Sequence, residues 1–182
     1  MSTAGAPTPP RKRTEVFYAK DARALGPETM STERPGEALQ AVMARLAEAG
    51  VKPGIGEKNL VLFSEPGETG LSLVYVWFKS HYVLAPHSHD SDCLYYVLDG
   101  ELRIGSRVLQ KGDGLFVPAG RVYAYEAGPD GVEVLEFRNA TRFNIALSDR
   151  DAGRWDRVLT TFRERADAWR TETTPPSQRK RT

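Results

Sequence analysis

The chain has little of several features that particular protein classes require. It contains one cysteine, so it cannot form an internal disulfide. Its formal net charge is +1, which argues against an electrostatic partner such as nucleic acid or an anionic membrane. No apolar run approaches the roughly 20 residues of a membrane span, and the opening MSTAGAPTPPRKR lacks the apolar core of a signal peptide. We therefore expect a cytoplasmic protein that binds neither nucleic acid nor membrane.

What is present suits one compact domain with loose ends. A chain of 182 residues has one domain as its default. Residues 1–14 and 171–182 are rich in Pro, Thr and basic residues, and we expect them to be disordered tails. Between the tails, the pattern predicts an N-terminal helical extension over 15–59, a β-barrel over 60–147 and a helix over 148–170.

Two segments have the apolar spacing of amphipathic helices. Residues 34–50, RPGEALQAVMARLAEAG, repeat apolar residues at helical spacing, and Pro35 suits a first turn. The segment 148–170 predicts the second helix, with Ser148 as its N-cap. Its apolar stripe is expected to pack on the barrel or on a partner subunit, and consists of Trp155, Val158, Leu159, Phe162, Ala166 and Trp169.

Short β-rich runs fill the segment between about residues 60 and 145. They are separated by turn signals such as EPGETG, KGDG, PAG and GPDG. Strands this short and this often interrupted predict an antiparallel sandwich or barrel. The sequence LDGEL predicts a tight hairpin at Asp99 and Gly100, because Asp-Gly readily takes the positive φ that such turns need.

The stretch APHSHDSDCLYYVLDGEL, residues 85–102, holds two of the three histidines and the cysteine. His87 and His89 are two residues apart, so an extended strand puts both imidazoles on one face. Two imidazoles inside a barrel are a starting point for a divalent transition-metal site. Further along, Tyr95 shares the parity of the cysteine and is expected to line the interior, whereas Tyr96 faces outward.

This stretch resembles the first motif of the cupin superfamily, G-x5-H-x-H-x3-E-x6-G. Its matching positions are His87, His89 and Gly100. A later stretch, GDGLFVPAGRVYAYEA, resembles the second motif, G-x5-P-x-G-x2-H-x3-N. The resemblance covers roughly residues 60–140 and implies an all-β core, an antiparallel double-stranded β-helix barrel, here with an N-terminal and a C-terminal helix. It also implies a metal held inside the barrel. The matching positions of the second motif are Gly112, Pro118 and Gly120.

The departures from these motifs leave three readings of the site open. Cys93 stands at the motif glutamate and Tyr123 at the third histidine. In the first reading His87 and His89 bind Fe, Zn, Mn, Ni or Cu together with Cys93, with Tyr123, or with both. In the second, the pocket is metal-free and works by hydrogen bonding or acid–base chemistry. In the third, these residues only pack the core. If the protein is an enzyme, Tyr123 and Cys93 are the predicted catalytic residues.

Other polar residues are weaker candidates. His81 is a possible replacement ligand, and Asp90 and Asp92 are expected to be loop carboxylates. Arg103 and Arg121 are candidates for binding a substrate carboxylate with a guanidinium fork.

Cupin relatives include dioxygenases, isomerases, decarboxylases and lyases, so the resemblance implies a protein that processes a small molecule. The sequence leaves open whether it is a divalent-metal-dependent enzyme with an altered ligand set or a metal-free protein that binds or senses a small molecule. Cupin relatives often dimerise through their outer strands, so we expect a homodimer.

Overall fold

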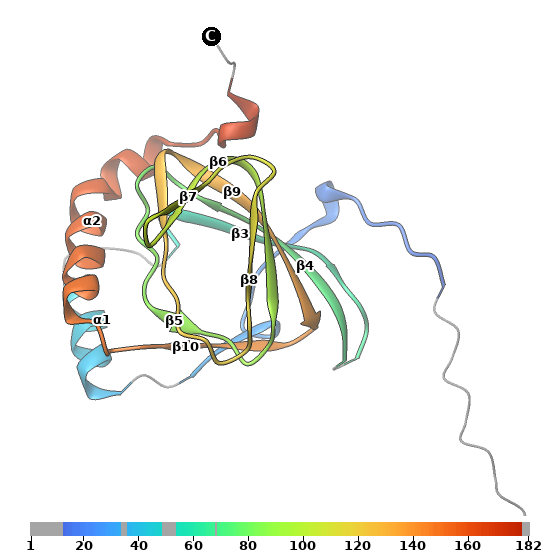
Figure 1. Ribbon diagram of the computed structural model, residues 1–182, viewed down its shortest axis with the longest axis horizontal. Helices are drawn as coiled ribbons and strands as arrows, with labels where there is room; N and C mark the ends of the chain where they lie inside the picture. Colours follow the sequence, from blue (N-terminus) through green and yellow to red (C-terminus); the bar gives the residue numbers. More distant parts are fainter. Residues whose placement is uncertain (1–12, 34–35, 49–53, 68, 180–182) are drawn as a thin grey trace, which may run out of the picture.

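The computed structural model describes residues 13–33, 36–48, 54–67 and 69–179. Two sheets, antiparallel except for one strand pair, curve into a barrel, and a long helix runs along one side of it (Figure 1). The predicted all-β core flanked by two helices is therefore confirmed.

The larger sheet carries most of the interior. Its strand order is β1-β3-β4-β9-β6-β7, with β8 also paired to β6, and every pairing is antiparallel. The bounds are β1 Arg23–Ala24, β3 Glu57–Ser64, β4 Thr69–Phe78, β6 Cys93–Ile104, β7 Arg107–Leu109, β8 Gly114–Val117 and β9 Glu126–Ala140.

A smaller sheet of order β2-β10-β5 covers the opposite side of the interior. Its β10–β5 pairing is antiparallel, whereas its β10–β2 pairing is parallel. The bounds are β2 Met30–Thr32, β5 His87–Ser88 and β10 Phe143–Leu147.

The segment predicted as a helical extension, 15–59, supplies strands to both sheets. β1 pairs with the edge strand β3, and β2 pairs with β10, so this extended backbone satisfies sheet groups that would otherwise lie unpaired. The helix α1 spans Glu37–Glu48, and the outer parts of the predicted helix, like residues 1–12, lie outside the described residues. Two 3₁₀ turns complete the elements, η1 Ala19–Asp21 and η2 Pro176–Gln178.

The prediction of a tight hairpin at Asp99 and Gly100 is wrong. Strand β6 continues through this point, and the register against β9 shifts on both sides of it, which is the pattern of a β-bulge. Gly100 has φ +82°, and a Cβ there would lie 2.2 Å from the carbonyl oxygen of Gly131, so only glycine fits. The chain instead turns from β6 into β7 at Gly105, whose φ is +58°.

The second helix, α2, spans Ala152–Thr171 and closes one side of the barrel. Asp151 caps it rather than the predicted Ser148, because the Asp151 carboxylate accepts from the backbone N–H of Arg154 at 2.9 Å. The apolar stripe packs inward as expected; for example, the Trp169 ring lies 5.5 Å from that of Tyr82. Among the described residues, neither helix is long and apolar enough to cross a membrane.

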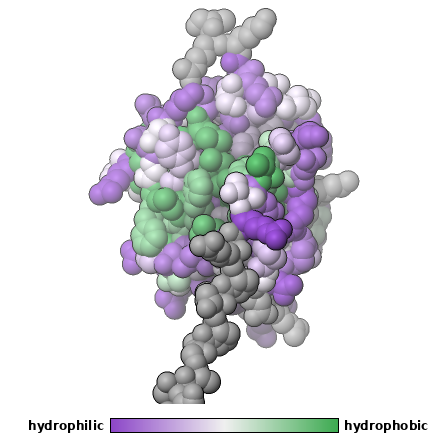
Figure 2. All heavy atoms as spheres, turned by 90° about the vertical axis from the view of Figure 1, so that its right-hand side faces the viewer, coloured by the Kyte–Doolittle hydropathy of each residue, from purple (hydrophilic) through white to green (hydrophobic). Residues whose placement is uncertain are grey.

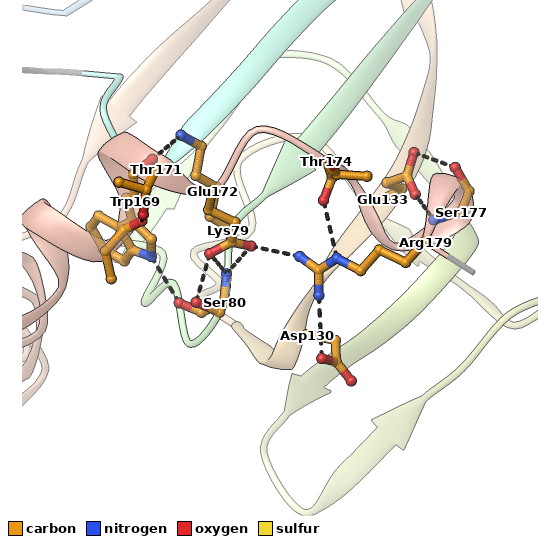
Figure 3. Close-up of polar contacts among 11 residues, drawn as sticks. Lys79, Ser80, Asp130, Glu133, Trp169, Thr171, Glu172, Thr174, Ser177 and Arg179 are labelled. Atoms are coloured by element: carbon orange, nitrogen blue, oxygen red, sulfur yellow. Dashed lines mark hydrogen bonds and ion pairs between the residues drawn. The ribbon is translucent and has the colours of Figure 1, made fainter. Parts of the chain in front are cut away.

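The segment predicted as a C-terminal disordered tail is docked on the barrel over residues 172–179. The Glu172 carboxylate accepts from the hydroxyl of Ser80 at 2.7 Å, and the backbone N–H of Ser177 donates to Glu133 at 2.6 Å (Figure 3). Composition alone predicts disorder here, because the segment has little to bury. Polar partners on β9 and on the turn after β4 hold it in place instead.

Candidate functional site

The interior site lies where the strand alternation of the large sheet brings polar side chains into the barrel. On β9, Val132 and Val134 face inward, and the same parity carries Glu136 and Arg138 inward two and four residues later. Tyr95 on β6 lies opposite Glu136 in the register. The barrel interior is therefore apolar around Val132 and Val134 and polar around Glu136 and Arg138.

Glu136 and Arg138 were not predicted from the sequence. The signal is present in VEVLEFRNA, because both charges share the phase of the buried valines. The Arg138 side chain is 1% exposed and its Nη2 donates to Glu136 Oε2 at 2.8 Å. Its Nε and Nη1 have no hydrogen-bond partner among the described residues. A buried, partly unpaired guanidinium thus sits beside the candidate site.

The two histidines are held in one tautomer by backbone carbonyls. His87 Nδ1 donates to the carbonyl of Ala85 at 2.8 Å, and His89 Nδ1 donates to the carbonyl of Asn144. A carbonyl can only accept, so Nδ1 carries the hydrogen in both rings and, in the neutral imidazole, Nε2 has a lone pair. An antiparallel bridge joins His87 to Tyr123, and their ring centroids lie 4.4 Å apart.

Both imidazoles are neutral at pH 7. Burial lowers the pKa of His87 to about 4, helped by the positive charge of Arg138. Burial lowers the pKa of His89 to about 3, and Arg138 and His87 lower it further. The histidines therefore present Nε2 as hydrogen-bond acceptors.

The residues at the two substituted motif positions are also neutral. Burial raises the pKa of the Cys93 thiol and of the Tyr123 hydroxyl well above their ordinary values. The hydroxyls of Tyr95 and Tyr123 share a hydrogen bond inside the barrel. Tyr95 is 1% exposed and the next tyrosine on the strand, Tyr96, is 45% exposed, which confirms the predicted parity.

A cavity of about 60 Å³ is lined by His87, His89 and Tyr95, but by neither Cys93 nor Tyr123. A water molecule takes about 30 Å³ in the liquid, so the cavity has room for only a few water-sized groups. Two of its lining atoms, Asn59 Oδ1 and the Tyr125 hydroxyl, are buried and have no hydrogen-bond partner among the described residues. The cavity is lined by Leu25, Met30, Glu57, Asn59, Val76, Phe78, Leu84, His87, His89, Tyr95, Tyr125, Glu136 and Ile145.

The remaining predicted candidates lie outside this cavity. His81 occupies the turn after β4 with φ +56° and does not line the cavity. The carboxylates of Asp90 and Asp92 accept backbone N–H groups in loops, as expected. Arg103 and Arg121 are exposed, so neither supplies a guanidinium to the interior.

The side chains do not complete a metal site. Among the described residues, no group of three His, Cys, Asp or Glu side chains is placed to hold a metal ion. His87 and His89 supply two nitrogen donors, while Cys93 is a protonated thiol that lies opposite Arg138 in the register. The guanidinium also disfavours a second cation nearby. Metal binding by His87, His89 and Cys93 stays a prediction.

A second hollow lies on the outer face of the large sheet. This apolar groove has a volume of about 450 Å³, and Phe116 at its wall is 61% exposed. Figure 2 shows apolar residues gathered on one side of the molecule, the right-hand side of Figure 1. The groove is lined by Phe17, Phe63, Leu71, Ser72, Leu73, Asp92, Leu94, Phe116, Phe137, Arg138 and Asn139.

Comparison with known proteins supports the fold. No protein-family model matches the chain, and no curated protein matches it. The polyketide cyclase RemF from Streptomyces resistomycificus aligns with a TM-score of 0.53 at 14% identity, covering 84% of this chain and 97% of its own. KdgF from Halomonas sp. aligns at 26% identity and a TM-score of 0.41, covering 49% of this chain and 82% of its own. An RmlC-like cupin from Shewanella frigidimarina aligns at 26% identity and a TM-score of 0.41, covering 50% and 80%. The alignment with RemF therefore shows that the two chains share a fold, the antiparallel β-barrel that the two motif stretches predict.

Proposed function

We propose that this protein binds a small polar molecule inside the barrel and does not transform it. The observation that carries the proposal is the chemistry of the barrel interior in and around the cavity. His87 and His89 present fixed acceptors, while the thiol of Cys93 and the hydroxyl of Tyr123 are buried and protonated. A general acid or base works best when its pKa lies near the working pH, and none of these four groups meets that condition. His87 and His89 line the cavity and suit the orientation of a ligand by hydrogen bonds.

A thermal-shift screen of small polar molecules tests this proposal. A true ligand raises the melting temperature increasingly with its concentration, because it binds only the folded state. We expect the increase to be lost in His87→Gln and kept in His81→Gln, since His81 does not line the cavity. If the wild type and His87→Gln respond alike to every compound, the interior is not the binding site.

Metal-dependent catalysis is the second candidate function, and one observation favours it. Imidazoles that bind metals usually donate their second ring N–H to a carbonyl or carboxylate, and His87 and His89 both donate Nδ1–H to backbone carbonyls. Elemental analysis of the purified wild type, of His87→Ala and of Cys93→Ser decides between the two. Stoichiometric metal that is lost in His87→Ala would support this candidate. The proposed function predicts no stoichiometric metal in any of the three proteins, under all loading conditions.

We also propose that the chain forms a homodimer through the outer face of the large sheet. The exposed stretch Val16, Phe17 and Tyr18 lies beside the apolar groove, and Phe17 contacts Phe63 with 5.7 Å between ring centroids. Both the stretch and the groove expose apolar side chains in a single chain. A two-fold pairing brings identical faces together and removes both surfaces from water at once.

A further inference from the structure

The polar atoms of the cavity wall are mostly acceptors. Asn59 Oδ1 can only accept, and it has no partner among the described residues. The Nε2 atoms of His87 and His89 carry lone pairs, because both Nδ1 atoms hold the hydrogen. Glu136 adds a carboxylate to the same wall. The Tyr125 hydroxyl, which can donate or accept, is the remaining polar group of the wall without a partner among the described residues. A ligand that matches this wall must therefore carry several hydrogen-bond donors.

The charges around the cavity select against an ionic ligand. Arg138 and Glu136 compensate one another through their hydrogen bond at 2.8 Å. An added carboxylate would face Glu136 and the acceptor atoms, and an added ammonium ion would lie close to Arg138. A second carboxyl group, that of Glu57, also lines the cavity, but burial raises its pKa and so favours its neutral form. Either ion would therefore be buried without a full counter-charge of its own, which is costly. The ligand that fits is uncharged.

The size of the cavity limits the ligand further, beyond the requirements for hydrogen-bond donors and for no charge. Its volume of about 60 Å³ admits only a ligand of a few non-hydrogen atoms. A ligand of this size that is uncharged and bears two or three hydroxyl groups meets all three limits.

We propose that the cavity is a binding site for a small uncharged polyol, whose hydroxyl groups donate to Asn59 Oδ1 and to the Nε2 atoms of His87 and His89. One ligand hydroxyl also shares a hydrogen bond with the Tyr125 hydroxyl. This inference rests on the proposed binding function and assigns the chemical class of its ligand.

The histidines provide the experimental readout. The chain has three, so proton NMR gives three imidazole Cε1–H signals. His87 and His89 line the cavity, whereas His81 lies in the turn after β4 and serves as an internal reference. Four matched probes are titrated at constant ionic strength: ethylene glycol and glycerol, which donate; acetone, which only accepts; and acetate, which is charged.

We expect ethylene glycol and glycerol to shift the His87 and His89 signals in a saturable way, with affinities about millimolar at best for ligands this small. Acetone and acetate leave the signals in place at tenfold higher concentration. Tyr125→Phe weakens binding of the glycols about three- to tenfold, as expected for the loss of one neutral hydrogen bond. The matched control Tyr96→Phe, on the exposed side of β6, leaves binding unchanged.

Two outcomes overturn the inference in different ways. If acetone or acetate binds as tightly as ethylene glycol, the site binds small molecules without recognising their hydrogen-bond donors. The assignment of a polyol ligand is then wrong, while the proposed binding function still holds. If none of the four probes shifts His87 or His89, and the thermal-shift screen also finds no ligand, the proposed function fails together with the inference. The comparison among the probes uses the wild-type protein, so it does not depend on the folding of any variant.

Discussion

Acid sensitivity of the fold follows from burying two neutral histidines. The unfolded chain binds a proton at each histidine near pH 6.5, whereas the folded chain does so only near pH 4 at His87 and pH 3 at His89. Between these values the unfolded state holds more protons, so the free energy of unfolding falls as the pH falls. The stabilisation is fully present above pH 6.5 and is lost as the pH drops towards the folded pKa.

The magnitude follows from proton linkage. Each histidine contributes about 1.4 kcal/mol per pH unit within this window. Both together lower the free energy of unfolding by about 4 kcal/mol between pH 6.5 and 4.5, because the slope is only half-developed at pH 6.5. Small domains are stable by about 5–15 kcal/mol in total, so these two residues alone bring the fold close to unfolding at pH 4.5.

Urea denaturation at a series of pH values between 4.5 and 8 measures the effect. We expect His87→Gln to remove about half of the extra slope, and the double variant His87→Gln/His89→Gln to remove nearly all of it. His81→Gln is the matched control, because His81 is only partly buried in its turn. EDTA in all samples excludes a contribution from bound metal. Equal slopes in the wild type and the double variant would refute the reasoning, since the histidines would then be solvated or already charged.

Three further predictions concern packing and assembly. Tyr123→Phe removes the hydrogen bond to the Tyr95 hydroxyl, so we expect urea denaturation to show a loss of about 1 kcal/mol, whereas no loss in Tyr123→Phe would mean that this bond adds no net stability. Glu172→Ala leaves the amide and hydroxyl of Ser80 without their carboxylate partner and should cost about 1–3 kcal/mol in the same assay; an unchanged midpoint would mean that the C-terminal segment does not contribute to stability. Phe116→Lys places a charge in the apolar groove, so light scattering should show a monomer where the wild type is a dimer; a variant that stays dimeric would place the interface elsewhere.

Local patterns in the sequence were enough to predict the architecture. They also identified His87 and His89 as interior residues, but not Glu136 and Arg138. The glycine, proline and histidine spacing of the two motif stretches predicted the barrel, and the period-two alternation put Tyr95 inside and Tyr96 outside. The bulge at Gly100 was missed because Asp-Gly suits both a hairpin and a bulge, and only the pairing with β9 distinguishes them. Residues 172–179 were missed because their partners are distant in sequence.

The sequence alone sets the strand parities and the residues at the motif positions, because a side chain's face on a strand depends only on its place in the alternation. It also determined that Cys93 and Tyr123 stand where the cupin motifs have glutamate and histidine. The tertiary structure was needed for the chemistry of the interior. It placed Arg138 and Glu136 beside the two histidines, fixed their tautomers through the carbonyls of Ala85 and Asn144, and left a cavity of about 60 Å³. Proton positions and pKa values depend on burial and on charges brought together from distant strands, and these exist only once the barrel has closed.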